Sequence, residues 1–368
     1  MLAELRLVSL RGDRGKLCAQ TVASVVMAVY LADVFHLKER WWVSLSAYVL
    51  IRANPRVVFS RSLERLAGTV IGAFAGLMLA VLVFPSAWLI IVALALVAGL
   101  GIYGMLGSPY AYSWVLGTVT ALMVLSDAAG VASLAHLALT RVLDVAVGVL
   151  ATAAVSALAF FMERLLRGGT ASTGTFSREA LGTGHTATPT VEHLRSTRIW
   201  QAVQGALAIA ILGVVNHVHA LPNVVQSMVS VVAVLLVPLS VLTGGDVVAA
   251  VHMRMLNRLL GCLCAALLAA PLLPLIGHVP VLCLAVLGAG VWLAAHVQAG
   301  SAQVSYIGTQ FGVGFIMIFV QDRAWSTDPS AALQRLMGIV GALVVLAATM
   351  AVFSMIGRKV RLDGGRSV

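Results

Sequence analysis

Four arginines lie where a charged side chain is unusual. Arg65 and Arg258 come at the start of long apolar stretches, and Arg141 and Arg335 lie several residues inside two others. A cation near the N-terminal end of a helix adds to the positive end of the helix dipole, so it costs free energy unless an anion lies there too. We therefore predict that these four arginines bind an anionic substrate.

Each arginine also has an interpretation that involves no ligand. The two at the starts of apolar stretches fall at the predicted edge of a membrane, where a long basic side chain reaches water by snorkelling. Arg141 has Asp144 one turn later, which suits a local ion pair. Arg335 has Gly338 in that position, so it is the stronger candidate for meeting an anionic substrate. Because an unpaired charge costs at least about 2.5–3.5 kcal/mol near the centre of a bilayer, both should face protein or water.

Two aspartates are candidate proton-coupling residues. Asp127 and Asp322 end two apolar stretches at equivalent places, where a carboxylate could take up a proton in an ion-coupled transporter or pair with a nearby arginine. A solvated loop residue is the alternative for each. No nucleophile and base stand together, and the sequence has no phosphate-binding loop, dinucleotide fingerprint or cluster of metal ligands. We therefore expect no enzyme activity, no cofactor and no metal site.

The elements that must position these side chains are strongly apolar. Of the 368 residues, 60% are hydrophobic and 10% are charged, and the mean hydropathy is +1.00, whereas a soluble domain is about 25% charged. Continuous apolar blocks favour helices over the alternating strands of a barrel. We predict an all-α integral membrane protein with twelve membrane-spanning helices. The predicted spans are 17–35, 41–52, 66–84, 88–106, 111–126, 133–161, 199–215, 224–242, 258–276, 280–298, 303–321 and 331–356.

The chain divides into two similar halves. Residues 1–166 and 199–357 each contain six predicted spans, 167–198 form a linker rich in Gly, Ser and Thr, and 358–368 form a basic tail. Short segments match across the linker at an offset of 193 to 195. The matched landmarks are Arg65 with Arg258, Asp127 with Asp322, and Arg141 with Arg335. Six-span halves that begin on the same side predict a parallel repeat about a pseudo-twofold axis along the membrane normal.

The placement of charge predicts the orientation of the chain. Of the 24 Lys and Arg residues, 19 fall in segments that share one side if the N-terminus is cytoplasmic. By the positive-inside rule, both termini are then cytoplasmic. The net charge of +10 reflects this topology and attraction to anionic membrane lipid. We therefore expect no binding to nucleic acid.

Several segments resemble the fusaric acid resistance family. They are Trp41-Trp42-Val43-Ser44-Leu45, the basic connector from Arg52 to Arg61, and Arg65-Leu66-Ala67-Gly68-Thr69-Val70-Ile71-Gly72. The plan of six spans, linker and six spans is similar to that family, which includes the aromatic carboxylic acid exporters of bacterial inner membranes. The resemblance implies export of aromatic or other hydrophobic carboxylates, driven by the proton gradient and assisted by a periplasmic adaptor protein. The chain departs from the larger exporters in having no sizeable cytoplasmic domain after each half.

Three hypotheses for function stay open. The leading one is a proton-coupled secondary transporter that exports organic anions across the bacterial inner membrane. The second is a passive anion channel along the pseudo-twofold axis, because plant malate channels, which have six spans per subunit and an arginine-lined pore, resemble one half of the chain. The third is a membrane scaffold subunit with no transport role.

Overall fold

A computed structural model of the chain describes residues 12–52, 54–127, 131–166, 191–221, 223–238, 241–242, 245–321 and 325–364. The elements formed by these residues are helices, apart from one isolated antiparallel bridge between Val320 and Trp325. The predicted all-α class is confirmed.

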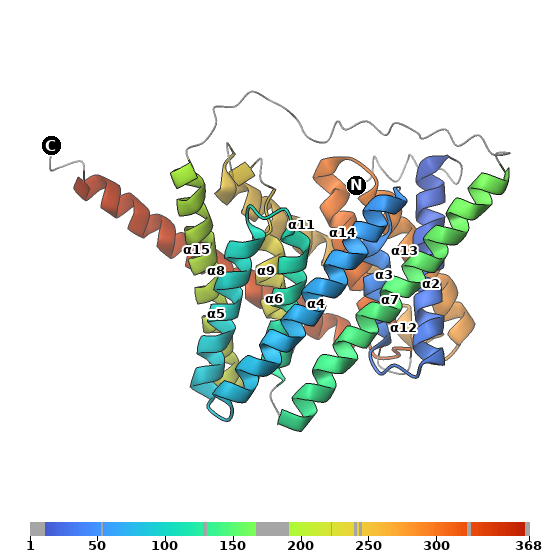
Figure 1. The fold of residues 1–368 in the computed structure, drawn as a ribbon, viewed down its shortest axis with the longest axis horizontal. Coiled ribbons are helices and arrows are strands. Elements are labelled where there is room, and N and C mark those ends of the chain that lie inside the picture. Colours follow the sequence, from blue (N-terminus) through green and yellow to red (C-terminus); the bar gives the residue numbers. More distant parts are fainter. Residues whose placement is uncertain are drawn as a thin grey trace.

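Figure 1 shows the helices in the order in which they follow one another along the chain. Those of the first half are α2 (Asp13–Val34), α3 (Arg40–Leu50), α4 (Pro55–Val83), α5 (Ala87–Met105), α6 (Ala111–Ser126) and α7 (Val131–Leu166). Those of the second half are α8 (Val191–His219), α9 (Val224–Leu235), α11 (Val247–Ala269), α12 (Leu273–Ile276), α13 (Pro280–Gln298), α14 (Ala302–Phe319) and α15 (Ser330–Gly364).

Not every predicted span is a full-length membrane helix. Within the described part of the chain, nine helices are long and apolar enough to cross a bilayer. The predicted spans 41–52, 111–126 and 224–242 correspond instead to α3, α6 and α9, which have 11, 16 and 12 residues. At 1.5 Å per residue, α3 and α9 are about 16–18 Å long, against a hydrocarbon core of about 30 Å. Neither is long enough to cross alone, and α9 ends at Leu235, three residues before the helix-breaking Pro238.

Two helices continue beyond the boundaries that the sequence suggested. α8 begins at Val191, inside the segment 167–198 that we assigned to the linker, and α15 continues to Gly364, inside the predicted tail. Both extensions contain Glu, Lys, Arg or Leu, which have good helix propensity despite their polarity. Residues 167–190 of the linker lie outside the described residues.

Two long helices begin well before the arginines of interest. The side chain of Asn54 accepts a hydrogen bond from the backbone N–H of Arg56 at 2.9 Å, with Pro55 in the first position of α4. Asp246 caps α11 in the same way, accepting from the N–H of Ala249 at 3.1 Å. Because these side chains satisfy the free N–H groups of a first turn, they fix the starts of α4 and α11.

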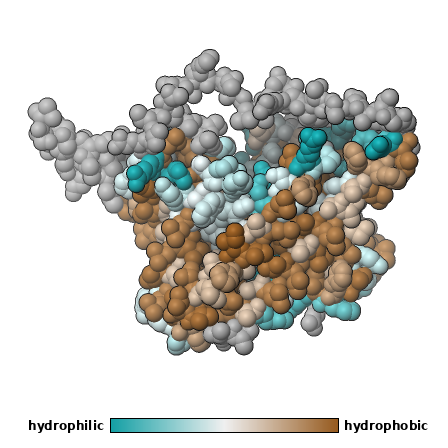
Figure 2. All heavy atoms as spheres, in the orientation of Figure 1, coloured by the Kyte–Doolittle hydropathy of each residue, from teal (hydrophilic) through white to brown (hydrophobic). Residues whose placement is uncertain are grey.

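The molecule has the surface of a multi-pass membrane protein. Figure 2 shows a broad apolar band on one face, with polar residues above and below it. Large apolar side chains are exposed on several of the long helices. They include Leu82, Leu100, Leu158, Phe161, Leu267 and Val344. A soluble protein rarely exposes so large a continuous apolar area.

The long helices run alternately between two sides of the molecule (Figure 1). We call one the linker side, where α7 ends and α8 begins, at the top of the view. We call the other the turn side, which holds the α2–α3 and α4–α5 turns at the bottom.

The short helices α3 and α9 lie inside the bundle. Most of their residues are buried. α3 packs against α2, α7 and α14, and α9 packs against α8, α15 and α6. Short helices enclosed by longer ones can end within the membrane because protein, and not lipid, surrounds their free backbone groups.

The contacts of the first half have counterparts in the second. α6 packs against α4 and α5, and α14 packs against α11 and α13. Between the halves, α2 contacts α13 and α3 contacts α14, while α8 contacts α5 and α9 contacts α6. The closest of these contacts are made by glycine: a Cβ at Gly72 of α4 would collide with the backbone oxygen of Gly117 in α6.

Candidate functional site

Arg65 is buried in the interior of α4. The helix begins ten residues earlier, at Pro55, and the exposed fraction of Arg65 is 3%. Its Nη1 donates to Tyr112 Oη of α6 and its Nη2 to Ser46 Oγ of α3, both at 2.9 Å. Among the described residues its Nε has no hydrogen-bond partner, and no carboxylate forms an ion pair with it. Snorkelling is therefore wrong for Arg65, and so is its predicted place at a helix start.

Arg258 has the same surroundings in the second half. It lies eleven residues after the start of α11 and is 3% exposed. Nη1 donates to Gln310 Oε1 of α14 at 2.6 Å, and Nη2 donates to Ser230 Oγ of α9 at 3.0 Å. Its Nε also lacks a partner in the described part of the chain. Snorkelling is wrong here too, and the described partners of both guanidinium groups are neutral.

A second arginine stacks on a tyrosine one turn before each of these. The Cζ of Arg61 lies 4.9 Å from the ring centre of Tyr112, and the Cζ of Arg254 lies 4.1 Å from that of Tyr306. Arg254 also donates to two carbonyl oxygens in the last turn of α9, at 3.0 and 3.2 Å. A cation in this position stabilises the negative end of the helix dipole.

Positive charge gathers on the linker side near the turn between α3 and α4. Burial, followed by the charge of nearby Arg61, lowers the pKa of Arg52 in that turn. The guanidinium of Arg52 donates to the carbonyl oxygen of Ile51 at 2.6 Å. Positively charged groups that line a low-dielectric mouth attract anions and raise their local concentration.

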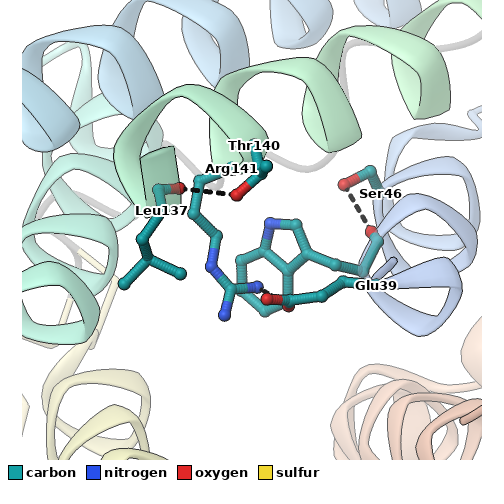
Figure 3. Close-up of polar contacts among 6 residues, drawn as sticks. Glu39, Ser46, Leu137, Thr140 and Arg141 are labelled. Atoms are coloured by element: carbon teal, nitrogen blue, oxygen red, sulfur yellow. Dashed lines mark hydrogen bonds and ion pairs between the residues drawn. The ribbon is translucent and has the colours of Figure 1, made fainter. Parts of the chain in front are cut away.

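Arg141 forms its ion pair with Glu39, and not with Asp144 as the sequence suggested. Glu39 immediately precedes α3, and its carboxylate meets Nη1 of Arg141 from α7 (Figure 3). The side chains of Arg141 and Glu39 are 9% and 14% exposed. The guanidinium also lies over the rings of Trp41 and Trp42, with Cζ 5.6 and 5.3 Å from their centres. This buried cation therefore has an anionic partner within the chain.

Arg335 lies in the first part of α15 and forms no ion pair with a described carboxylate. It is 7% exposed, and its hydrogen bond to another described residue runs from Nη1 to the sulfur of Met317 in α14. Its Nε and Nη2 have no hydrogen-bond partner among the described residues. Arg258 lies close enough to repel it electrostatically. Two buried cations thus lie near each other, and no described carboxylate pairs with either.

The two candidate aspartates are not described as part of the arginine site. Asp127 is exposed at the end of α6, where its backbone N–H donates to the carbonyl oxygen of Met123 at 3.2 Å. This position agrees with the solvated alternative, and no described contact joins Asp127 to the four arginines. Asp322 lies outside the described residues.

A cavity of about 410 Å³ lies at the turn side, beside the start of α3. Its lining residues are Ala32, Asp33, His36, Leu37 and Arg40. Across it, Arg40 Nη1 meets Asp33 Oδ1 at 2.6 Å. None of the four predicted arginines lines this cavity, so it is separate from the arginines that we predicted as one site.

Sequence reasoning missed the neutral partners of the arginines and the importance of Glu39. Arg61 and Arg254, like Tyr112 and Tyr306, recur at offsets of 193 and 194, so a search of the repeat for polar pairs would have found them. Glu39 has no counterpart that the repeat reveals. From its sequence position just before a short helix, Glu39 looks like an ordinary surface residue. Only the packing of α7 beside it shows that it pairs with Arg141.

Part of the first half matches a known family. Residues 27–155 match the family model described as "Fusaric acid resistance protein-like". This part of the chain is similar to that family. The resemblance seen in the sequence is confirmed, and the family's range extends from α2 into α7, so it contains Glu39, Arg65 and Arg141. Neither the curated proteins nor the solved structures that were compared gave a match.

Proposed function

We propose that this fusaric acid resistance-like protein is a secondary transporter that exports organic anions, such as aromatic carboxylates, across the bacterial inner membrane. The observation that carries the proposal is the pair Arg258 and Arg335, two buried cations with no carboxylate partner in the described part of the chain. Leaving a charge buried without a counter-ion costs several kcal/mol. A bound organic anion would supply that counter-ion.

The proposal includes two parallel six-helix repeats, supported by paired side-chain contacts. Arg14 of α2 donates to the carbonyl oxygen of His296 in α13, and Arg198 of α8 donates to that of Tyr103 in α5 at 2.8 Å. These contacts cross between the halves in opposite directions, as a twofold axis requires. The pairs of Arg65 with Ser46 and of Arg258 with Ser230 have the same relation within each half.

The direction of transport follows from the distribution of charge. With the linker side in the cytoplasm, the basic residues obey the positive-inside rule. Arg52, Arg61 and Arg254 then lie nearest the cytoplasm, Arg65 and Arg258 lie deeper, and Arg141 and Arg335 lie nearer the turn side. An anion would meet successive cations on its way out.

Proton coupling and the adaptor are proposals of the same kind. Asp127 and Asp322 stay the candidate proton-coupling residues, and Asp127 is exposed. A periplasmic adaptor would meet the turn side, and membrane lipid would cover the apolar band.

Export from reconstituted vesicles tests the function. We expect wild-type protein to release preloaded radiolabelled benzoate, and Arg335→Gln or Arg258→Gln to reduce the initial rate at least about tenfold, because each removes a buried charge partner. Arg56→Gln is the matched control, since Arg56 is exposed in the first turn of α4, and it should export normally. Full export by both buried-arginine variants would contradict the proposal. Unitary currents in a planar bilayer would instead indicate a passive channel.

A further inference from the structure

Arg141 and Arg335 lie at similar positions in their helices but have different partners. Each lies in the first part of the last long helix of its half, α7 or α15, and each is 7% exposed. The guanidinium of Arg141 is matched by a carboxylate, and that of Arg335 meets a thioether. The carboxylate of Glu39 therefore occupies the place that an anionic ligand would take.

We propose that Arg141, Trp41 and Trp42 form a second anion site, and that the Glu39 carboxylate is a tethered occupant which displaces a transported monocarboxylate from it. This inference rests on the proposed function, because it treats Arg141 and Arg335 as counterparts along one anion path.

The surroundings of Arg141 suit a site that is emptied and refilled. Trp41 and Trp42 lie 5.6 and 5.3 Å from its Cζ, and such cation–π contacts hold a guanidinium in place without neutralising it. Glu39 comes from the turn between α2 and α3, and in this proposal its side chain swings away from Arg141 while α7 keeps its position. Arg141 would then stay in position and offer its charge to another carboxylate.

Among the described charged groups near the turn, Glu39 is the one that contacts Arg141. Asp33 pairs with Arg40 at 2.6 Å, and His36, Lys38 and His136 are exposed. Asp144 is buried one turn beyond Arg141 on α7, and α14, which packs on α3, has no charged residue. Glu39 is the carboxylate that forms the ion pair with Arg141.

Counting bound benzoate on the full-length chain in lipid nanodiscs tests the proposal. Wild type should bind one benzoate per chain, at Arg335, and Glu39→Gln should bind two. Adding Arg141→Gln to that variant should remove one of its two sites. Asp33→Asn breaks the neighbouring ion pair in the same turn and is the matched control, so it should bind one.

Transport kinetics provide a second reading. Without the displacing carboxylate, Glu39→Gln should lower KM severalfold and reduce the turnover rate at least fivefold, because benzoate leaves Arg141 slowly. Glu39→Asp keeps the charge and should restore most of the turnover. A purely structural role of Glu39 would instead raise KM or destabilise the protein in both variants.

If Glu39→Gln does not fold, the wild-type protein can still test the proposal. A carboxylate on a short tether competes like free ligand at about millimolar concentration, so benzoate well above that level should fill a second, weaker site. Arg141→Gln should lack it. One site in Glu39→Gln, or no weak site in wild type, would overturn the inference even if Arg335→Gln abolished binding and so supported the proposed function. The two proposals can also fail separately in the other direction. If Glu39→Gln has a benzoate site that depends on Arg141, and Arg335→Gln does not change binding, the inference stands and the proposed function is contradicted.

Discussion

At the scale of single residues, Arg141 and Arg335 look alike in the sequence but differ in whether a described carboxylate neutralises their charge. Arg141 has a carboxylate partner, and Arg335 has none in the described part of the chain. A buried ion pair that loses one member leaves an uncompensated charge, whereas removing a buried charge that has no counter-ion relieves a desolvation cost. The same substitution should therefore have opposite effects at the two positions.

Arg335→Met and Arg141→Met test this difference. Without ligand, we expect Arg335→Met to raise the free energy of unfolding by about 1–4 kcal/mol, and Arg141→Met to lower it by about 3–5 kcal/mol because Glu39 stays buried and unpaired. Thermal unfolding in detergent, followed by tryptophan fluorescence, measures both. Equal destabilisation by the two variants would show that Arg335 has a counter-ion in the ligand-free protein.

At the scale of elements, α4 and α6 approach so closely that their contact depends on glycine. A Cβ at Gly72 would collide with the backbone oxygen of Gly117, and one at Gly68 would collide with the backbone oxygen of Ser113. The same helices present Arg65 and Tyr112 to each other. Separating the helices would therefore lengthen the hydrogen bond that holds Arg65.

Gly72→Ala should accordingly lower both stability and transport. We expect a loss of about 1–3 kcal/mol in the free energy of unfolding, as for other overpacked positions, and a lower rate of benzoate export. Gly341→Ala in α15 is the matched control, because nothing lies within 4 Å of its added Cβ. It should be neutral or stabilise the helix by up to about 1 kcal/mol. If the two variants behave alike, the contact between α4 and α6 does not need glycine.

The helices themselves were largely predictable, because their main signal is local. Each predicted span overlaps a helix, since an apolar stretch in a membrane must satisfy its own backbone hydrogen bonds. The lengths of α3 and α9 were not predictable in this way. Their apolar composition resembles that of a membrane span, and what shortens them is enclosure by other helices.

The candidate site was less predictable, because its partners come from distant parts of the chain. Arg65, Arg141, Arg258 and Arg335 were found by residue type and position. Their partners lie on other helices, and only the packing of α3 against α7 shows that Glu39, and not Asp144, pairs with Arg141. Periodicity and spacing in the sequence identify neighbours one helical turn apart, but they do not identify contacts between different helices.

At the scale of the whole molecule, the linker side and the turn side should lie on opposite sides of the membrane. The linker side carries most of the basic residues, and these are retained in the cytoplasm when a membrane protein inserts. His36 is exposed in a turn on the turn side, and Arg56 is exposed at the start of α4 on the linker side. These two positions report the orientation directly.

Cysteine labelling in intact cells lacking an outer membrane tests this orientation. An impermeant maleimide added outside should label His36→Cys to near completion and leave Arg56→Cys unlabelled until the cells are opened. The native thiols should add little background, because Cys18, Cys262 and Cys283 are buried and Cys264 is partly buried. Each variant should still export benzoate, because neither side chain contacts the four arginines. Labelling of Arg56→Cys alone from outside would instead show that the linker side, with its arginines, faces the periplasm.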